Sequence, residues 1–120
     1  MNKYFFDSYA LFEITYGNQK YLPYAQEGGV TTIFNISELN YGLKKTKSLQ
    51  EANVLTDIFK PNVIKVTWQD IKKAMDLKIK RKEMSIPDVI GYTVAKRLDI
   101  PFLTGDEDFK NLDNVEFVKK

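Results

Sequence analysis

The sequence predicts an α/β fold, a three-layer α/β/α sandwich around a parallel sheet of about five strands. Short apolar or β-branched segments alternate along the chain with longer segments of helical periodicity, which is the pattern of βαβ units. The strand segments are apolar throughout, as expected where helices cover both faces of a sheet. The chain has 120 residues, and we expect one domain spanning residues 1–120.

Five segments are predicted strands because each is short, apolar or β-branched, and bounded by turn or cap residues. In chain order they are residues 4–6, 31–34, 63–66, 101–104 and 115–118. Right-handed crossovers between successive parallel strands place the intervening helices on both faces of the sheet.

Six helical segments are predicted between these strands. In chain order they are residues 8–16, 18–29, 36–47, 49–59, 68–82 and 85–98. Ser8, Thr67 and Ser85 are suited to begin three of them, because a side-chain oxygen at the N-cap accepts a hydrogen bond from the first turn. A glycine pair at residues 28–29 ends the second segment.

The composition removes several classes of chemistry. The chain contains no cysteine and no histidine. Disulfides, thiolate catalysis and cysteine-bound metals are therefore excluded, together with histidine bases and histidine metal ligands. Polar chemistry is left to carboxylates, amines, hydroxyls and the backbone.

Four carboxylates are predicted to meet at one edge of the sheet: Asp7, Glu38, Asp88 and Asp106. Two of them follow predicted strands and two lie in what reads as the first turn of a helix, and both kinds of end open onto the ligand-binding edge of an α/β sheet. Four acids there favour a hard divalent cation, Mg²⁺ or Mn²⁺. Ser8 and Thr104 could add hydroxyls, and Asp108 could be a fifth ligand.

Each acid also has a purely structural interpretation. Asp7 and Asp106 could cap the turns that follow them. Residues 35–38 and 85–88 both read as capping boxes, in which the acid at the fourth position reaches back to the cap amide. Caps alone do not explain why all four acids fall on the same predicted edge, where their mutual repulsion would cost stability unless a cation offsets it.

A basic stripe precedes the last predicted helix. The net charge of the chain is only +2, but residues 72–82 concentrate Lys72, Lys73, Lys78, Lys80, Arg81 and Lys82. Such a stripe can hold the phosphates of RNA, and the alternative is an ordinary solvated helix face.

Four segments resemble, in order, the motifs of PIN-domain ribonucleases. They are residues 5–11, 36–43, 86–95 and 102–109, reading FFDSYAL, ISELNYGL, IPDVIGYTVA and FLTGDEDF. In its compact length the chain most resembles VapC-type toxins. The resemblance implies an Mg²⁺- or Mn²⁺-dependent endoribonuclease whose acids are Asp7, Glu38, Asp88 and Asp106. It also implies cleavage that leaves a 5′-phosphate, a homodimer and an inhibitory protein antitoxin.

Two other functions stay open at this point. A non-catalytic RNA- or protein-binding domain could keep the fold without activity. A receiver-type signalling domain needs an acidic pair after its first strand and an aspartate after its third, where this chain has Asp7-Ser8 and Val66-Thr67. No targeting signal or membrane-length apolar run is visible, so we expect a cytoplasmic protein without a membrane partner.

Overall fold

The computed structural model describes residues 3–120, and the strands in that part of the chain form one parallel sheet in the order β2-β1-β3-β4. The strands are β1 (Tyr4–Phe6), β2 (Gly29–Val30), β3 (Phe102–Thr104) and β4 (Val115–Phe117). Phe5 pairs with Val30 on one side and with Phe102 on the other. The first strand is therefore central, and its C-terminal end opens in the middle of the sheet edge.

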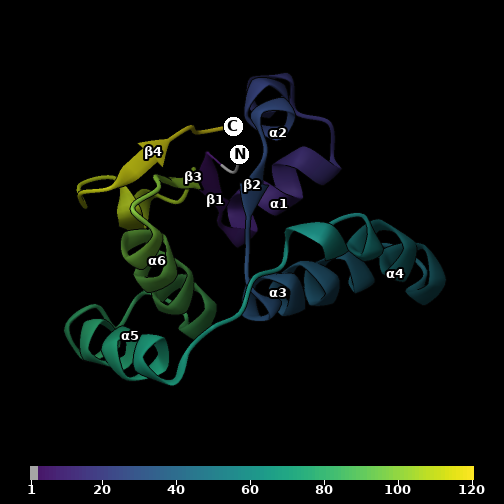
Figure 1. Cartoon of the computed structure of the whole chain (residues 1–120). Coiled ribbons are helices and arrows are strands. Elements are labelled where there is room, and N and C mark those ends of the chain that lie inside the picture. Colours follow the sequence, from purple (N-terminus) through teal and green to yellow (C-terminus); the bar gives the residue numbers. More distant parts are fainter. Residues whose placement is uncertain (1–2) are drawn as a thin grey trace.

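Six α-helices surround the sheet in the described part of the chain (Figure 1). They are α1 (Ser8–Thr15), α2 (Leu22–Glu27), α3 (Ile33–Lys44), α4 (Leu49–Asp57), α5 (Trp68–Lys80) and α6 (Ile86–Leu98). The short 3₁₀ helices are η1 (Gln19–Tyr21), η2 (Lys60–Asn62) and η3 (Glu107–Phe109). The order confirms the predicted alternation of strands and helices.

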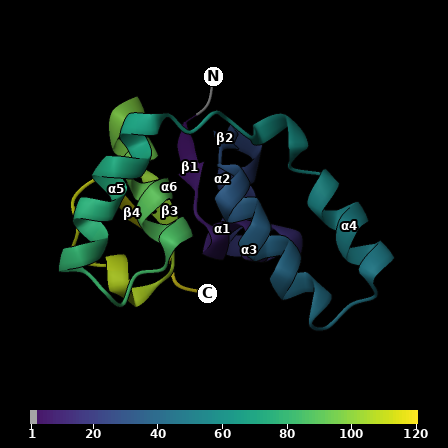
Figure 2. The same ribbon diagram turned by 90° about the horizontal axis from the view of Figure 1, so that it is seen from below.

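The two faces of the sheet bury separate cores, because neighbouring residues of a strand point to opposite sides. Phe5 and Phe102 face the core that α5 and α6 cover. Phe6 and Leu103 face the core that α1, α3 and α4 cover. Figure 2 shows the result, with α5 and α6 at one end of the molecule and α4 at the other. The predicted three-layer sandwich is confirmed.

Two of the predicted strands are wrong. Residues 31–34 do not form a strand, since β2 ends at Val30 and Thr32 already caps α3 by accepting a hydrogen bond from the Asn35 amide. Residues 63–66 contribute only an isolated bridge between Thr31 and Val63, so the described sheet has four strands. Both segments are β-branched and apolar, but Phe34, Ile64 and Val66 pack against the core on the α5–α6 side of the sheet instead of extending the sheet.

The start of α3 also differs from the prediction. The helix begins at Ile33, one turn earlier than residue 36, so residues 35–38 are not a capping box. Asn35 lies inside the helix and is fully buried. Glu38 consequently stands in the second turn of α3 instead of the first.

No helix within residues 3–120 combines the length and the apolar character needed to cross a lipid bilayer.

Candidate functional site

The four predicted acids come together at the C-terminal edge of the sheet. Asp7 directly follows β1, and Asp106 stands two residues after the end of β3. Asp88 lies in the first turn of α6, and Glu38 lies in α3. Their charges act on one another: Asp7 is influenced by Asp88 and Glu38, and Asp88 by Glu38 and Asp106. The folded chain thus assembles the predicted cluster from four separate segments.

Asp7 is the most deeply buried member, with 1% of its surface exposed. Thr104 Oγ1 donates a hydrogen bond of 2.6 Å to its Oδ2. Among residues 3–120, the other oxygen, Oδ1, is buried and has no hydrogen-bond partner. Burial raises the pKa of the Asp7 carboxyl well above its usual range, and the charge of Asp88 raises it further. A buried carboxylate oxygen without a partner is costly unless a ligand occupies the space beside it.

Glu38 is held at both of its oxygens by serine hydroxyls. Ser8 Oγ donates to Oε1 at 2.5 Å, which places the predicted supporting hydroxyl in the site. Ser85 Oγ donates to Oε2 at 3.2 Å, a contact that was not predicted because the sequence shows Ser85 only as a helix cap. The two serines fix the plane of a carboxylate that is otherwise half-buried.

Asp88 forms the predicted capping box with Ser85. Its Oδ2 accepts a hydrogen bond of 3.0 Å from the Ser85 amide, while its own amide donates to Ser85 Oγ at 3.2 Å. The pKa of Asp88 is nevertheless raised to about 6, first by burial and then by the charges of Glu38 and Asp106, against the lowering effect of the Ser85 amide. The cap is real, and it does not remove the repulsion within the cluster.

Thr104 joins the two acids that follow the central strands. While its hydroxyl donates to Asp7, its Oγ1 accepts from the Asp106 amide at 3.1 Å. The Asp106 side chain in turn accepts from the Asp108 amide at 2.9 Å and caps η3. Asp108 itself is partly exposed, and its backbone oxygen accepts a hydrogen bond of 2.7 Å from Arg81 Nη2.

The donor set fits a hard divalent cation by its chemistry. Carboxylate and hydroxyl oxygens are the ligands that Mg²⁺ and Mn²⁺ prefer, and Asp7 Oδ1 is a buried oxygen free to coordinate. As the side chains stand, no group of three acids within residues 3–120 is arranged to hold an ion. Binding of a cation to this cluster therefore requires some of these carboxylates to shift toward it.

The basic stripe is divided by the structure into groups with different surroundings. Lys78 Nζ donates to the backbone oxygens of Lys82 and Met84 and so fastens the connection between α5 and α6. Arg81 pairs with Glu83 at 2.6 Å and, through its contact with Asp108, reaches the acidic edge. The remaining members are exposed on α5 or just after it: Lys72, Lys73, Lys80 and Lys82.

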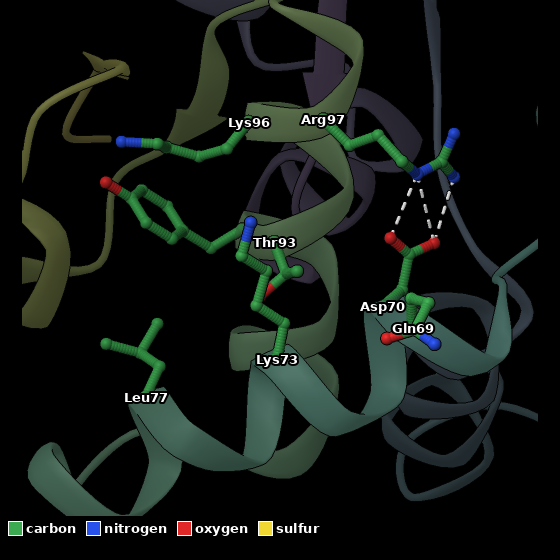
Figure 3. A pocket seen from close by; sticks show the side chains of 8 residues that line it. Gln69, Asp70, Lys73, Leu77, Thr93, Lys96 and Arg97 are labelled. Carbon is green, nitrogen blue, oxygen red and sulfur yellow. Dashed lines mark hydrogen bonds and ion pairs between the residues drawn. The ribbon is translucent and has the colours of Figure 1, made fainter.

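A pocket of about 470 Å³ lies between α5 and α6, away from the acids (Figure 3). At one end the Arg97 guanidinium faces the Asp70 carboxylate, with contacts of 2.9 Å from Nε and from Nη2. This pairing holds the pKa of Asp70 below its usual value, although burial acts in the opposite direction. Lys73 and Lys96 project from the two helices toward the rest of the pocket. None of the four predicted acids lines this pocket.

Comparisons with known proteins agree with this architecture. One similar solved structure, described as a toxin-antitoxin complex from Klebsiella pneumoniae, is 18% identical, covers 99% of this chain and 100% of its own, and has a TM-score of 0.76. Another, VapBC2 from Rickettsia felis bound to a DNA fragment from the promoter, is 15% identical, covers 98% of each chain, and has a TM-score of 0.72. These likenesses show a shared fold. No curated protein matches.

A family model matches nearly the whole chain, including almost all of the sheet. The PIN domain model matches residues 4–115, which include all four acids and every helix described above. The resemblance predicted from the four motifs is confirmed, as is the α/β fold class, and the chain belongs to the PIN domain family.

Proposed function

We propose that this protein is a metal-dependent endoribonuclease and the toxin component of a type II toxin–antitoxin pair. The observation that carries the proposal is a group of four acids, Asp7, Glu38, Asp88 and Asp106, whose charges act on one another. Within residues 3–120, one buried oxygen of this group, Asp7 Oδ1, has no hydrogen-bond partner. Burial and then the charges of neighbouring acids raise the pKa values of Asp7 and Asp88, and a divalent cation relieves the repulsion among these charges.

The four carboxylates would hold Mg²⁺ or Mn²⁺, with Asp108 as a further ligand or outer partner. A bound divalent ion supplies activation of water and neutralises the charge that develops on the phosphate. The chain itself supplies the rest. Ser8 and Thr104 keep the Glu38 and Asp7 carboxylates in place. One carboxylate of the cluster would accept a proton from the attacking water, whose oxygen bonds to phosphorus as the bond from phosphorus to the 3′ oxygen breaks. The 3′ oxygen leaves as a hydroxyl by taking up a proton from solvent, and the other fragment keeps the 5′-phosphate.

The basic residues of the stripe provide contacts to RNA phosphates. Lys72, Lys73, Lys80 and Lys82 are exposed, and Arg81 extends from the end of α5 to the turn that carries Asp108. Positive charge along this path attracts a polyanion toward the acidic edge without taking part in the chemical step. Lys78 contributes charge as well, although its ammonium group is already engaged by two carbonyls.

A protein antitoxin and a second copy of the chain are the proposed partners, and the cytoplasm is the proposed location. Two observations support a protein partner. The similar structure from Klebsiella pneumoniae is described as a toxin-antitoxin complex. On α3 and the α4 region of this chain, the apolar side chains of Tyr41, Leu49, Val54 and Ile58 each expose 61–67% of their surface, which offers apolar area for a partner to cover.

Manganese titration combined with RNA cleavage tests the proposed activity. The wild type should cleave RNA only when Mn²⁺ or Mg²⁺ is added, and Asp88→Asn should not. The matched control is Asp57→Asn, because Asp57 is an exposed acid at the end of α4, outside the cluster. If the wild type binds RNA but leaves it intact at saturating Mn²⁺, the chain is instead a non-catalytic binding domain of the same fold.

A further inference from the structure

A buried chain of hydrogen bonds leads from the start of α3 to the Glu38 carboxylate. Thr32 Oγ1 donates to Asn35 Oδ1 at 2.7 Å, and Asn35 Nδ2 donates to Ser8 Oγ at 3.1 Å. Ser8 Oγ then donates to Glu38 Oε1 at 2.5 Å. Thr32 and Asn35 are fully buried, and Ser8 is 6% exposed, so water does not compete for these bonds.

The direction of every bond in this chain is fixed by the one before it. The Asn35 backbone amide donates to Thr32 Oγ1, which leaves the threonine proton for Asn35 Oδ1. With Oδ1 accepting, the amide must present its Nδ2 protons to Ser8. Ser8 Oγ accepts there, so its single proton is free to go to Glu38. Without the donor from Asn35, nothing in this chain would prevent the Ser8 hydroxyl from turning away.

Asn35 also lies where the helices that carry the acids meet. Its Nδ2 is 3.5 Å from the backbone oxygen of Pro87, which immediately precedes Asp88. A Cβ atom added at Gly91 would lie only 3.2 Å from Asn35 Oδ1, so α6 and α3 approach closely at this point. The Asn35 amide therefore touches α1 through Ser8, α6 through Pro87, and its own helix through Thr32.

We infer that Asn35 is a positioning residue of the acidic site, acting through Ser8 to hold the Glu38 carboxylate in the orientation that receives the divalent cation. The inference rests on the proposed function, since it assumes that the cluster binds a cation. Outer partners of ligating carboxylates typically change metal affinity by about ten- to a hundredfold when they are removed. Asn35 was expected from the sequence to be only a helix cap, and no motif marks it as part of the site.

The simpler alternative is that the buried Asn35 amide only stabilises the fold. The two roles differ in how Asn35 depends on Ser8. A positioning role passes through the Ser8 hydroxyl, whereas a structural role leaves the effect of Asn35 independent of it. Non-additivity of two substitutions separates these cases.

The test measures Mn²⁺ affinity by calorimetry, without RNA, for wild type, Asn35→Ala, Ser8→Ala and the double variant. We expect each single variant to bind Mn²⁺ about ten- to a hundredfold more weakly, and the double variant to bind no more weakly than the poorer single one. The matched control is Asn62→Ala, which removes an asparagine amide donating 2.8 Å to the Gly29 carbonyl and should leave Mn²⁺ affinity unchanged.

Wild-type affinity in Asn35→Ala, or losses that multiply in the double variant, would overturn the inference. If Asn35→Ala does not fold, Thr32→Val replaces it, because that variant removes the hydroxyl that orients the amide, and unchanged affinity there has the same meaning. Glu38→Gln separates failure of the inference from failure of the proposed function. Absence of Mn²⁺ binding in the wild type would overturn the proposed function together with the inference. Weakened binding in Glu38→Gln but not in Asn35→Ala would overturn the inference alone.

Discussion

Asp70 and Asp88 occupy the same local structure in two helices that pack against each other. Each is the third residue of its helix and completes a capping box, with Thr67 and Ser85 respectively. Both are buried, with 3% and 9% of their surface exposed. Asp70 meets the Arg97 guanidinium, whereas Asp88 meets the charges of Glu38 and Asp106.

The pKa values of these two carboxyls therefore move in opposite directions. Arg97 and the Thr67 cap hold the pKa of Asp70 below its usual value despite burial. Burial and the neighbouring acids raise the pKa of Asp88 to about 6. The helix cap and the ion pair with Arg97 together explain why Asp70 is buried, because its negative charge is already paired with a cation. Asp88 lacks a cation within the described residues, which is why the same motif indicates a structural role in one helix and a ligand site in the other.

Neutralising the two aspartates should separate their roles most clearly. Asp88→Asn should lower RNA cleavage by about a hundredfold or more, and Asp7→Asn, Glu38→Gln and Asp106→Asn should behave alike. Asp70→Asn should leave cleavage within about twofold of wild type, because its partner Arg97 lies outside the cluster. Initial rates at saturating Mn²⁺ check this. Full activity in two or more of the four cluster variants would refute the catalytic assignment.

Manganese should stabilise the protein only where the cluster is complete. Binding to the native state alone adds about 2.7 kcal/mol to the free energy of unfolding at free Mn²⁺ a hundredfold above Kd. For a domain of this size that corresponds to a rise in Tm of roughly 10 °C. Asp70→Asn should keep this rise and Asp88→Asn should lose most of it, as thermal melts with and without Mn²⁺ can show. A wild-type Tm unmoved by millimolar Mn²⁺ would rule out the site.

The pH dependence of stability should have opposite signs for the two aspartates in metal-free protein. Asp88 ionises less readily folded than unfolded, so its stabilising contribution is present below its ordinary value of 3.8 and is lost as pH rises through about 6. The loss is about 2–3 kcal/mol, since one pKa unit corresponds to about 1.4 kcal/mol. The free energy of unfolding of Asp88→Asn, measured with denaturant from about pH 4 to about pH 7, should lack the part of this decline that Asp88 causes.

For Asp70 the lowered pKa gives the reverse behaviour. Its contribution is present above the unfolded pKa and is lost as pH falls through the folded value. Asp70→Asn should therefore flatten the acid side of the stability profile and leave the neutral side unchanged in shape. The same pH profile in both variants would mean that Arg97 does not distinguish them.

The smallest effect is expected at the exposed lysines of α5 and of the residues just after it. Replacing Lys72, Lys80 and Lys82 by Gln should weaken RNA binding and reduce the slope of log affinity against log salt by about 2, at roughly 0.7 per phosphate contact. Turnover at saturating RNA should stay unchanged, because only uniform binding is lost. The control variant replaces Lys45, Lys47 and Lys60, on the α3–α4 side, by Gln. An equal slope in both triple variants would identify the stripe as a solvated face.

Local sequence predicted those parts of the site that depend on neighbours along the chain. Asp7 and Asp106 could be placed because each follows a short apolar strand, and Asp88 because Ser85 lies three residues before it. The α/β class followed from the alternation of segments, and the order of the four motifs identified the family.

What the sequence did not predict depends on contacts between distant residues. Asn35 reads as a cap, yet Thr32 caps α3 and Asn35 reaches Ser8, 27 residues away. Ser85 contacts Glu38 across 47 residues, and no spacing rule anticipates that. Residues 31–34 have the composition of a strand, but the hydroxyl of Thr32 starts a helix there because that hydroxyl satisfies the Asn35 amide.

The junction of β1 and α1 contains no spare length. Phe6 ends the strand, Ser8 begins the helix, and Asp7 alone connects them. Insertions or deletions at this point would rotate Asp7 and Ser8 away from their partners, even if both cores stayed intact. The connection between α3 and α4, whose residues 45–48 are largely exposed, carries no such restriction. In homologues and in engineered variants, length changes should accumulate at that connection and be absent between Phe6 and Ser8.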